Sequence, residues 1–284
     1  MKAIDSLRYV MDNRTEIINL DNCKEIYTNC SGTSATRYKV WLEYNNEYII
    51  FKEANKHVGG ERIYEDVSEM IVNDIGEIIG VDVIFTKLAT YKNMIGTFTY
   101  KINNLIELSS LISIDYPEFN KKKPFDVIKY DIEFVKSYFK NIEQFYDLMI
   151  LDYIVSQSDR HPSNIGFVNN YLAPIYDNGN SLGSFIYDDE LDRYINKVNK
   201  LCSADLKSCV GLGDYRPSYW NNIIDTIGKE DYVKKKIHND LLPHRKEILS
   251  TSDKYDIIDK RKELIKAILN YKLNYMEAMY EKVS

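Results

Sequence analysis

Apolar and polar residues alternate over the first hundred positions in short runs that are typical of β-strands. Residues 37–44 alternate in this way, and residues 47–52 return after the turn signal Asn45-Asn46. Residues 83–91 and 94–100 form a second such pair. The pattern therefore predicts two β-hairpins in this part of the chain.

Helical spacing dominates the rest of the pattern. Residues 67–79 carry apolar side chains three and four positions apart, as do residues 134–155 and 255–281. The apolar stripe of the last segment consists of Ile257, Ile258, Leu264, Ile265, Ile268, Leu269, Leu273 and Met276. We expect this stripe to pack in the core rather than to bind a partner. The order of elements predicts an α+β fold, with a β-rich part at 1–100 and an α-helical part at 101–284.

A polar loop interrupts the pattern between residues 156 and 164. The apolar helix before it ends near Val155, and the loop leads into a predicted strand at 165–168. Asn169-Asn170 is a hairpin turn signal, and residues 172–176 are predicted to form the returning strand. This hairpin would bring its two ends together, with Asn164 at one end and Asp177 at the other.

Three side chains of this segment form a candidate catalytic set for phosphoryl transfer. Asp159 would face the attacking hydroxyl, and Asn164 and Asp177 would hold Mg²⁺ on the phosphates of a nucleoside triphosphate. Magnesium prefers hard oxygen ligands, which suits these residue types. Asp, Asn and Gly are also ordinary turn residues, and each position alone is more often a cap or a turn. The combined arrangement favours the functional interpretation.

Two charged residues of the β-rich part extend the set. Lys52 ends the second predicted strand, where its ammonium group would reach nucleotide phosphates. Glu69 lies in the following predicted helix, and an ion pair between the two would orient the lysine. Alternatively, Lys52 is a surface charge at a strand end, and Glu69 is an acidic residue favoured by the helix dipole. The candidate catalytic residues Asp159, Asn164 and Asp177 further along the chain favour the functional interpretation.

The segment 28–39 is the candidate phosphate-covering loop. It contains Ser31, Gly32, Thr33 and Ser34, which are small enough to let backbone amides approach ATP phosphates. It has one glycine and so departs from a glycine-rich loop, and a plain polar loop is an equal alternative for each residue. Its hydroxyl groups are also candidates for autophosphorylation, with Ser31 and Ser34 leading.

These motifs resemble those of the HipA-like serine/threonine protein kinases, in particular the small single-domain type. The resembling residues are Tyr44-Asn45-Asn46-Glu47 to Lys52, Ser68-Glu69 to Thr90-Tyr91-Lys92-Asn93, Asp159-Arg160-His161, Asn164, Gly166-Phe167 and Ala173-Pro174-Ile175-Tyr176-Asp177. The order Asp-Arg-His, instead of the usual kinase His-Arg-Asp, distinguishes this family. The resemblance covers most of the chain and implies a two-lobed protein-kinase-like fold.

The resemblance also implies a role for individual residues. Asp159 matches the catalytic residue, Asn164 and Asp177 match the magnesium ligands, and Lys52 matches the lysine that contacts the ATP phosphates. The neighbouring Arg160 and His161 are expected to be supporting residues, because the mechanism needs no imidazole. Kinases of this type use ATP and Mg²⁺, phosphorylate a protein, and are often toxins neutralised by an antitoxin-like partner.

Two other functions remain open. A kinase for a small molecule or a lipid head group would use the same phosphoryl-transfer residues, because the fold does not reveal the acceptor. A catalytically weak ATP-binding regulatory module is the other alternative. The presence of all four core positions, Lys52, Asp159, Asn164 and Asp177, argues against the second.

Composition and charge limit the classes of protein to which this chain can belong. The 284 residues include 44% hydrophobic residues, enough for a sizeable core, and the net charge of −6 argues against direct nucleic-acid binding. No apolar stretch is long enough for a membrane span. The four cysteines, at 23, 30, 202 and 209, lack the spacing of common zinc sites. We expect them to be reduced in a cytoplasmic protein.

Overall fold

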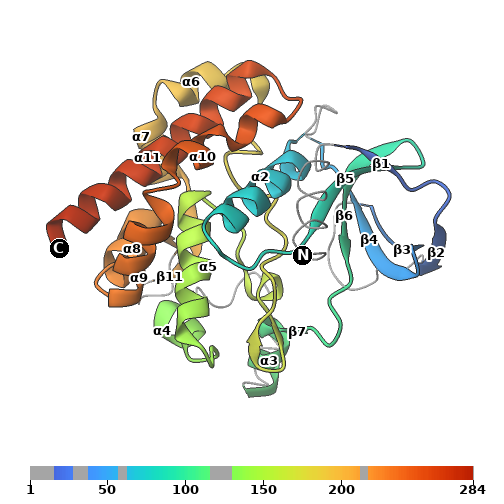
Figure 1. The fold of residues 1–284 in the computed structure, drawn as a ribbon, viewed down its shortest axis with the longest axis horizontal. Helices are drawn as coiled ribbons and strands as arrows, with labels where there is room; N and C mark the ends of the chain where they lie inside the picture. The colour runs from blue at the N-terminus through green and yellow to red at the C-terminus, as the bar shows by residue number, and fades with distance from the viewer. Residues whose placement is uncertain (1–15, 28–37, 57–62, 116–129, 212–216, 284) are drawn as a thin grey trace, which may run out of the picture.

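The computed structural model describes residues 16–27, 38–56, 63–115, 130–211 and 217–283. A six-stranded sheet, of order β1-β5-β6-β4-β3-β2, lies at one side, and a group of helices lies at the other (Figure 1). Its strands are β1 (Ile18–Asn19), β2 (Lys24–Tyr27), β3 (Lys39–Tyr44), β4 (Glu47–Glu53), β5 (Thr86–Tyr91) and β6 (Met94–Tyr100). The predicted α+β fold class is confirmed.

Both predicted hairpins of the sheet are present. β3 pairs with β4 and β5 pairs with β6, each antiparallel and joined by a two-residue turn. Asn45 and Asn46 have φ angles of 52° and 65°, and Lys92 and Asn93 have φ angles of 48° and 63°. Two successive positive φ angles match the right-handed twist of the strands, and asparagine tolerates this conformation better than most residues other than glycine.

The two faces of the sheet differ in what they pack against. One face carries a separate apolar cluster that includes Val40, Phe51 and Phe98. Successive residues of a strand point to opposite faces, so Lys52 and its register partner Thr97 share the other face. Helix α2 (Glu65–Ile78) lies beside the sheet (Figure 1) and carries Glu69, which contacts both residues. The alternation along β4 and β6 thus brings Lys52 to the helix.

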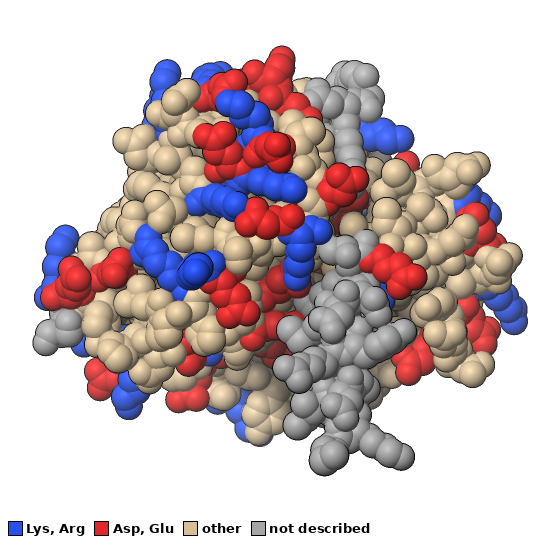
Figure 2. Space-filling view, turned by 45° about the horizontal axis from the view of Figure 1, so that its top comes forward, with Lys and Arg blue, Asp and Glu red and all other residues tan. Residues whose placement is uncertain are grey.

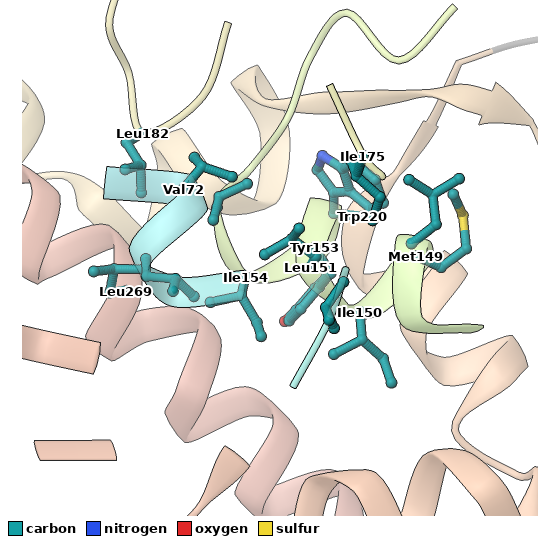
Figure 3. Close-up of a cluster of buried hydrophobic side chains, with 14 of the residues drawn as sticks. Val72, Met149, Ile150, Leu151, Tyr153, Ile154, Ile175, Leu182, Trp220 and Leu269 are labelled. Atoms are coloured by element: carbon teal, nitrogen blue, oxygen red, sulfur yellow. The ribbon is translucent and has the colours of Figure 1, made fainter. Parts of the chain in front are cut away.

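The remaining elements are mostly helical. They are β7 (Ile106–Glu107), α3 (Leu108–Asp115), β8 (Tyr130–Asp131), α4 (Ile132–Lys136), α5 (Ile142–Ile154), η2 (Pro162–Asn164), β9 (Gly166–Val168), β10 (Tyr171–Leu172), η3 (Asp188–Glu190), α6 (Leu191–Ile195), α7 (Val198–Lys200), η4 (Leu201–Asp205), β11 (Lys207–Gly211), β12 (Pro217–Tyr219), α8 (Trp220–Ile227), α9 (Asp231–Lys236), η5 (Ile237–Leu241), α10 (Arg245–Ser250), η6 (Thr251–Lys254) and α11 (Asp259–Val283). Figure 3 shows their core, a buried cluster that includes Ile154, Trp220 and Val72 of α2.

The prediction of one helix over residues 134–155 was wrong. Two helices, α4 and α5, occupy this region, and the chain between them is not helical. The side chain of Asn141 accepts a hydrogen bond from the backbone N–H of Glu143 at 3.1 Å and caps the start of α5. A capping residue inside a continuous apolar pattern starts a new helix, because its side chain replaces the missing intrahelical acceptor.

The apolar stripe of the last helix packs in the core, as expected. Leu264, Ile268 and Leu273 of α11 are fully buried. The exception is Ile258, which is 46% exposed and precedes the first residue of the helix. α11 crosses the helical group diagonally and ends at the margin of the molecule (Figure 1).

The hairpin that follows the polar loop is shorter than expected. β9 and β10 pair across Asn169-Asn170, but β10 ends at Leu172, so the predicted strand over residues 172–176 was wrong. Ile175 instead forms a parallel bridge with Val83, and the backbone N–H of Ile84 donates to the Ile175 carbonyl oxygen at 3.0 Å. This arm of the hairpin therefore attaches to the segment between α2 and β5.

Charges of both signs are mixed over the helical face. Figure 2 shows Lys and Arg side chains among Asp and Glu side chains, without a large field of either sign. Ion pairs join several of them, such as Arg193 with Glu190 at 3.1 Å. Within the described ranges, no helix is both long and apolar enough to cross a membrane.

A buried lysine in α11 gives a stability prediction. Lys272 is fully buried, its Nζ has no hydrogen-bond partner among the described residues, and it lies 4.3 Å from the centre of the Tyr153 ring. Burial lowers the pKa of Lys272 to about 8. In the unfolded chain, the Lys272 amine keeps its proton up to a higher pH than in the folded protein. Burying the charged amine therefore lowers the free energy of unfolding by its full amount below pH 8, and this cost fades as the pH rises above 8.

Replacing Lys272 with methionine should therefore raise the free energy of unfolding by about 2–3 kcal/mol at pH 7. The gain should shrink as the pH rises above 8, where the folded protein already holds a neutral amine. Urea denaturation at pH 7 and pH 9.5 measures both values, with the exposed Lys246→Met of α10 as the matched control. A gain in the free energy of unfolding that is the same at both pH values would contradict the lowered pKa of Lys272.

Candidate functional site

The site is built around an ion pair between the sheet and the hairpin. Lys52, on β4, places its Nζ 3.2 Å from Oδ1 of Asp177, which follows the hairpin and is 125 positions away in sequence. Asp177 has a φ angle of 56°, a conformation that costs energy for a residue other than glycine. The surrounding contacts must hold this turn, and they aim the carboxylate at Lys52.

Lys52 also faces the helix next to the sheet. Its Nζ lies 4.0 Å from Oε1 of Glu69, and the hydroxyl of Thr97 donates to Oε2 of the same carboxylate at 3.3 Å. Lys52 is 8% exposed and Glu69 is 3% exposed. Partly dehydrated charges interact more strongly than surface charges. The two carboxylates, one from α2 and one from the hairpin, therefore hold the ammonium group between them.

The close approach of β6 to β4 positions the backbone of Lys52. A Cβ atom on Gly96 would lie 1.9 Å from the carbonyl oxygen of Lys52 and 3.0 Å from the Cα of Glu53. These contacts are with backbone atoms, which cannot rotate away. Only glycine at position 96 allows this strand spacing.

Gly96→Ala should accordingly lower the free energy of unfolding by about 1–3 kcal/mol, because two strands must move apart. It should also weaken nucleotide binding, because Lys52 shifts with its strand. Chemical denaturation measures the first effect and Mg-ATP titration the second. Ile95→Ala, at a 47% exposed position of the same strand, is the control and should have a much smaller effect on both.

Asp159 lies in the polar loop with its carboxylate half-buried. The side-chain amide of Asn180 donates to Oδ2 of Asp159 at 3.0 Å. The backbone carbonyl of Asp159 accepts from the backbone N–H of His161 at 2.9 Å and from the side-chain amide of Asn164 at 2.9 Å. The loop thus holds the residue at both its backbone and its side chain.

Gln157 links the backbones of Asp159 and Asp177. Its Oε1 accepts from the backbone N–H of Asp159 at 2.9 Å, and its Nε2 donates to the carbonyl oxygen of Asp177 at 3.2 Å. The indole N–H of the buried Trp220 donates to the Gln157 carbonyl at 3.1 Å. Gln157 is fully buried, so these bonds tie both aspartates to the helical core.

Arg160 is the centre of a buried polar network. It is 1% exposed, and its guanidinium forms a two-pronged pair with Asp152 of α5, with Nη2 to Oδ1 at 2.9 Å and Nε to Oδ2 at 2.9 Å. Burial raises the pKa of the Asp152 carboxyl, and the guanidinium opposes that rise. Such a pair fixes the loop against α5, since removing one partner would leave a buried charge unpaired.

The same guanidinium also bonds to the backbone at or next to both metal-ligand candidates. Nη1 of Arg160 donates to the carbonyl oxygen of Asn164 at 3.0 Å and to that of Tyr176 at 2.6 Å. Tyr176 immediately precedes Asp177. One nitrogen of Arg160 therefore holds both the backbone of Asn164 and the backbone next to Asp177. Their oxygens are hard donors of the kind Mg²⁺ prefers, and this ion commonly takes its other ligands from phosphates and water. The residues present therefore fit a magnesium ion.

The polar network continues into helix α2. Nη2 of Arg160 donates to Oδ1 of Asn178 at 2.6 Å, and Nδ2 of Asn178 donates to Oδ1 of Asn73 at 3.1 Å. Asn73 in turn donates to the Ile84 carbonyl oxygen at 2.6 Å. Asn73 and Glu69 lie one turn apart on α2. The helix whose Glu69 contacts Lys52 is therefore fixed to the loop that contains Asp159.

The remaining predicted site residues fall into two groups. His161 caps the short helix η2, because its Nδ1 accepts from the backbone N–H of Ser163 at 3.2 Å. Ser31, Gly32, Thr33 and Ser34, in contrast, lie outside the described residues. The structure therefore brings Lys52, Glu69 and Asp177 together and joins Asp159 to Asn164, and it does not describe the candidate phosphate loop.

Several residues of the site were missed by the sequence analysis. They are Asn73, Asp152, Gln157, Asn178 and Asn180. One signal was available for Asp152, which is the only charged residue in the apolar run Leu148–Val155 and so requires a buried partner. Gln157, Asn178 and Asn180 gave no such signal, because Asn and Gln near a turn are common without any function. Asn73 gave none either, because a single polar residue in a helix is ordinary.

Comparison with known proteins adds to this geometry. No family model and no curated protein matches the chain. Its fold is that of a two-lobed, protein-kinase-like protein. Among solved structures, the chain is similar to the Helicobacter pylori proinflammatory kinase CtkA, with a TM-score of 0.75 and 19% identity over 94% of this chain and 98% of that chain.

A second similar structure extends the comparison. HipA of Shewanella oneidensis MR-1, solved with HipB and its operator DNA, matches with a TM-score of 0.55 and 12% identity. The match covers 100% of this chain and 72% of that chain. The two likenesses confirm the HipA-like kinase fold that the motifs indicated.

Proposed function

We propose that the protein is an ATP-dependent serine/threonine protein kinase of the HipA type. The observation that carries this proposal is the 3.2 Å contact between Lys52 and Asp177, which joins the phosphate-binding and metal-binding candidates from distant parts of the chain. In this proposal residues 1–100 and 101–284 act as the two lobes. Similarity to CtkA and HipA supports the kinase class.

The residues divide the work of phosphoryl transfer. The acceptor hydroxyl oxygen forms a bond to the γ-phosphorus while the bond from that phosphorus to the β–γ bridging oxygen breaks, and ADP leaves. Asp159 takes or orients the hydroxyl proton, and Lys52, held by Glu69, neutralises phosphate charge. Asn164 and Asp177 would hold Mg²⁺, which when bound stabilises charge on the phosphate oxygens.

The test is phosphate transfer from radiolabelled Mg-ATP to dephosphorylated casein, followed by phosphoamino-acid analysis. The proposal expects labelled phosphoserine or phosphothreonine that depends on Asp159. ATP turnover without protein labelling, in the presence of lipid or small-molecule extracts, would favour a small-molecule or lipid kinase. Mg-ATP binding without any turnover would favour a regulatory module and contradict the proposal.

Partners and location belong to the same proposal. We infer a protein substrate and an antitoxin-like protein regulator, because the similar HipA structure was solved with HipB. We also infer a cytoplasmic setting, where ATP and Mg²⁺ are abundant.

Autophosphorylation gives a further prediction. The sequence makes Ser31 and Ser34 the expected acceptors, because they lie in the candidate phosphate-covering segment. Each phosphate would add roughly −1.5 to −2 charges and should repel ATP. Intact-mass measurement after incubation with Mg-ATP should show a gain of about 80 Da per phosphate that Asp159→Asn abolishes. Modification that maps only outside residues 28–37 would reject these positions.

A further inference from the structure

Asn180 makes a side-chain contact with the candidate catalytic carboxylate. Its Nδ2 donates to Oδ2 of Asp159 at 3.0 Å, across 21 positions of sequence. An amide nitrogen is a donor only, so its partner Oδ2 acts as an acceptor in this bond. Among the described residues, the other oxygen, Oδ1, accepts no hydrogen bond.

The structure also holds Asn180 in place from the other side. Its backbone carbonyl accepts from the N–H of Ser158 at 3.1 Å and from the hydroxyl of Ser158 at 3.1 Å. Ser158 is the residue directly before Asp159. The loop and the segment after the hairpin are therefore closed into a small ring of hydrogen bonds, with the carboxylate at one corner.

The neighbours of Asn180 limit how far it can move. Gly179, just before it, packs so tightly on helix α2 that a Cβ would lie 3.0 Å from the Cβ of Glu65. Ser181, just after it, accepts at its carbonyl a hydrogen bond of 2.9 Å from the Ser68 hydroxyl of α2. The helix that orients Lys52 through Glu69 thus also fixes the backbone on both sides of Asn180.

We propose that Asn180 is a positioning residue that sets the rotamer of the Asp159 carboxylate, so that one oxygen faces the acceptor hydroxyl. This inference rests on the proposed kinase function. A flexible carboxylate would spend time in rotamers that cannot accept the proton, and correct orientation of a proton acceptor is part of its effect on rate. The role is distinct from binding ATP, which Lys52 and the metal ligands would perform.

The test compares the kinetics and the binding of two variants with those of the wild-type protein. Asn180→Ala should lower kcat for casein phosphorylation by about 10- to 100-fold, the range for losing a hydrogen bond to a charged group. Asn180→Asp keeps the shape and places a carboxylate against Oδ2 of Asp159, so its loss should be larger. The KM for ATP and the affinity for Mg-ATP should stay near the wild-type values in both variants, and the melting temperature should stay near the wild-type value in Asn180→Ala.

A double variant isolates the route of the effect. If Asn180 acts through Asp159, then Asp159→Asn with Asn180→Ala should be no slower than Asp159→Asn alone. Asn199→Asp, at an exposed position of α7, is the control and should keep full activity. Full activity of Asn180→Ala, additive losses in the double variant, or a parallel loss of ATP affinity and stability would overturn the inference.

The same experiment separates this inference from the proposed function. A wild-type protein that binds Mg-ATP but transfers no phosphate to any acceptor overturns the kinase function, and the positioning role with it. An active wild-type protein whose activity survives Asn180→Ala overturns the positioning role alone.

Discussion

Replacing Asp159 with asparagine should reduce phosphate transfer by about 10²–10⁴-fold, the range for a proton-accepting and positioning group. The change keeps the size of the side chain and removes its ability to take a proton. Affinity for Mg-ATP should stay nearly unchanged, because the phosphates would be held by Lys52 and the metal ligands. Rate measurements with casein, together with calorimetric titration of Mg-ATP, check both parts.

A matched control makes this result specific. Asp231→Asn in α9 is the same chemical change on a side chain that is 90% exposed, and it should leave the rate unchanged. If Asp159→Asn keeps near wild-type turnover, the assignment of Asp159 is wrong. If it loses ATP affinity as well, Asp159 acts on the nucleotide instead of the acceptor.

Asp177→Ala should abolish Mg-dependent ATP binding, the second large effect that we expect. The change removes an anionic oxygen ligand, and it also removes the carboxylate that lies 3.2 Å from Lys52. Asn164→Ala should weaken binding less, because a neutral oxygen attracts a dication less than a carboxylate does. Calorimetric titration with ATP, with and without Mg²⁺, measures the ATP affinity of each variant and shows which of the two loses more.

Stability must be followed in the same samples. The positive φ angle of Asp177 costs energy, and alanine tolerates it less well than aspartate, so a glycine variant serves as the second test. Asp177→Gly should also lose Mg-dependent binding while relieving the backbone strain. Unchanged affinity in both variants would mean that the residue only forms a turn.

The elements that the sequence predicted correctly are those whose signals are local. Paired asparagines define turns because their side chains tolerate positive φ angles, and the hairpin at Asn45-Asn46 was found for that reason. The 3.6-residue period in α11 identified a buried stripe, because one face of a helix packs as a unit. The candidate roles of Asp159, Asn164 and Asp177 also came from a local motif, and they stay predictions.

The errors arose where a backbone hydrogen-bond partner, distant or local, decides the structure. The expected strand over residues 172–176 ends at Leu172, because Ile175 bonds to the segment around Val83 instead of to β9. The expected helix over 134–155 is interrupted, because its apolar period did not reveal the cap at Asn141. Periodicity reports which side chains are buried, and it does not report which backbone partner satisfies each polar group.

The sequence by itself determined the residue types of the site, the hairpins of the sheet and the order of strands before helices. Only the tertiary structure decided which of these residues meet. Lys52 reaches Asp177, Arg160 joins α5 to the hairpin, and Asn180 reaches Asp159. The reason is that hydrogen bonds and ion pairs between distant segments depend on how helices and strands pack, and the local spacing of residues carries no record of that packing.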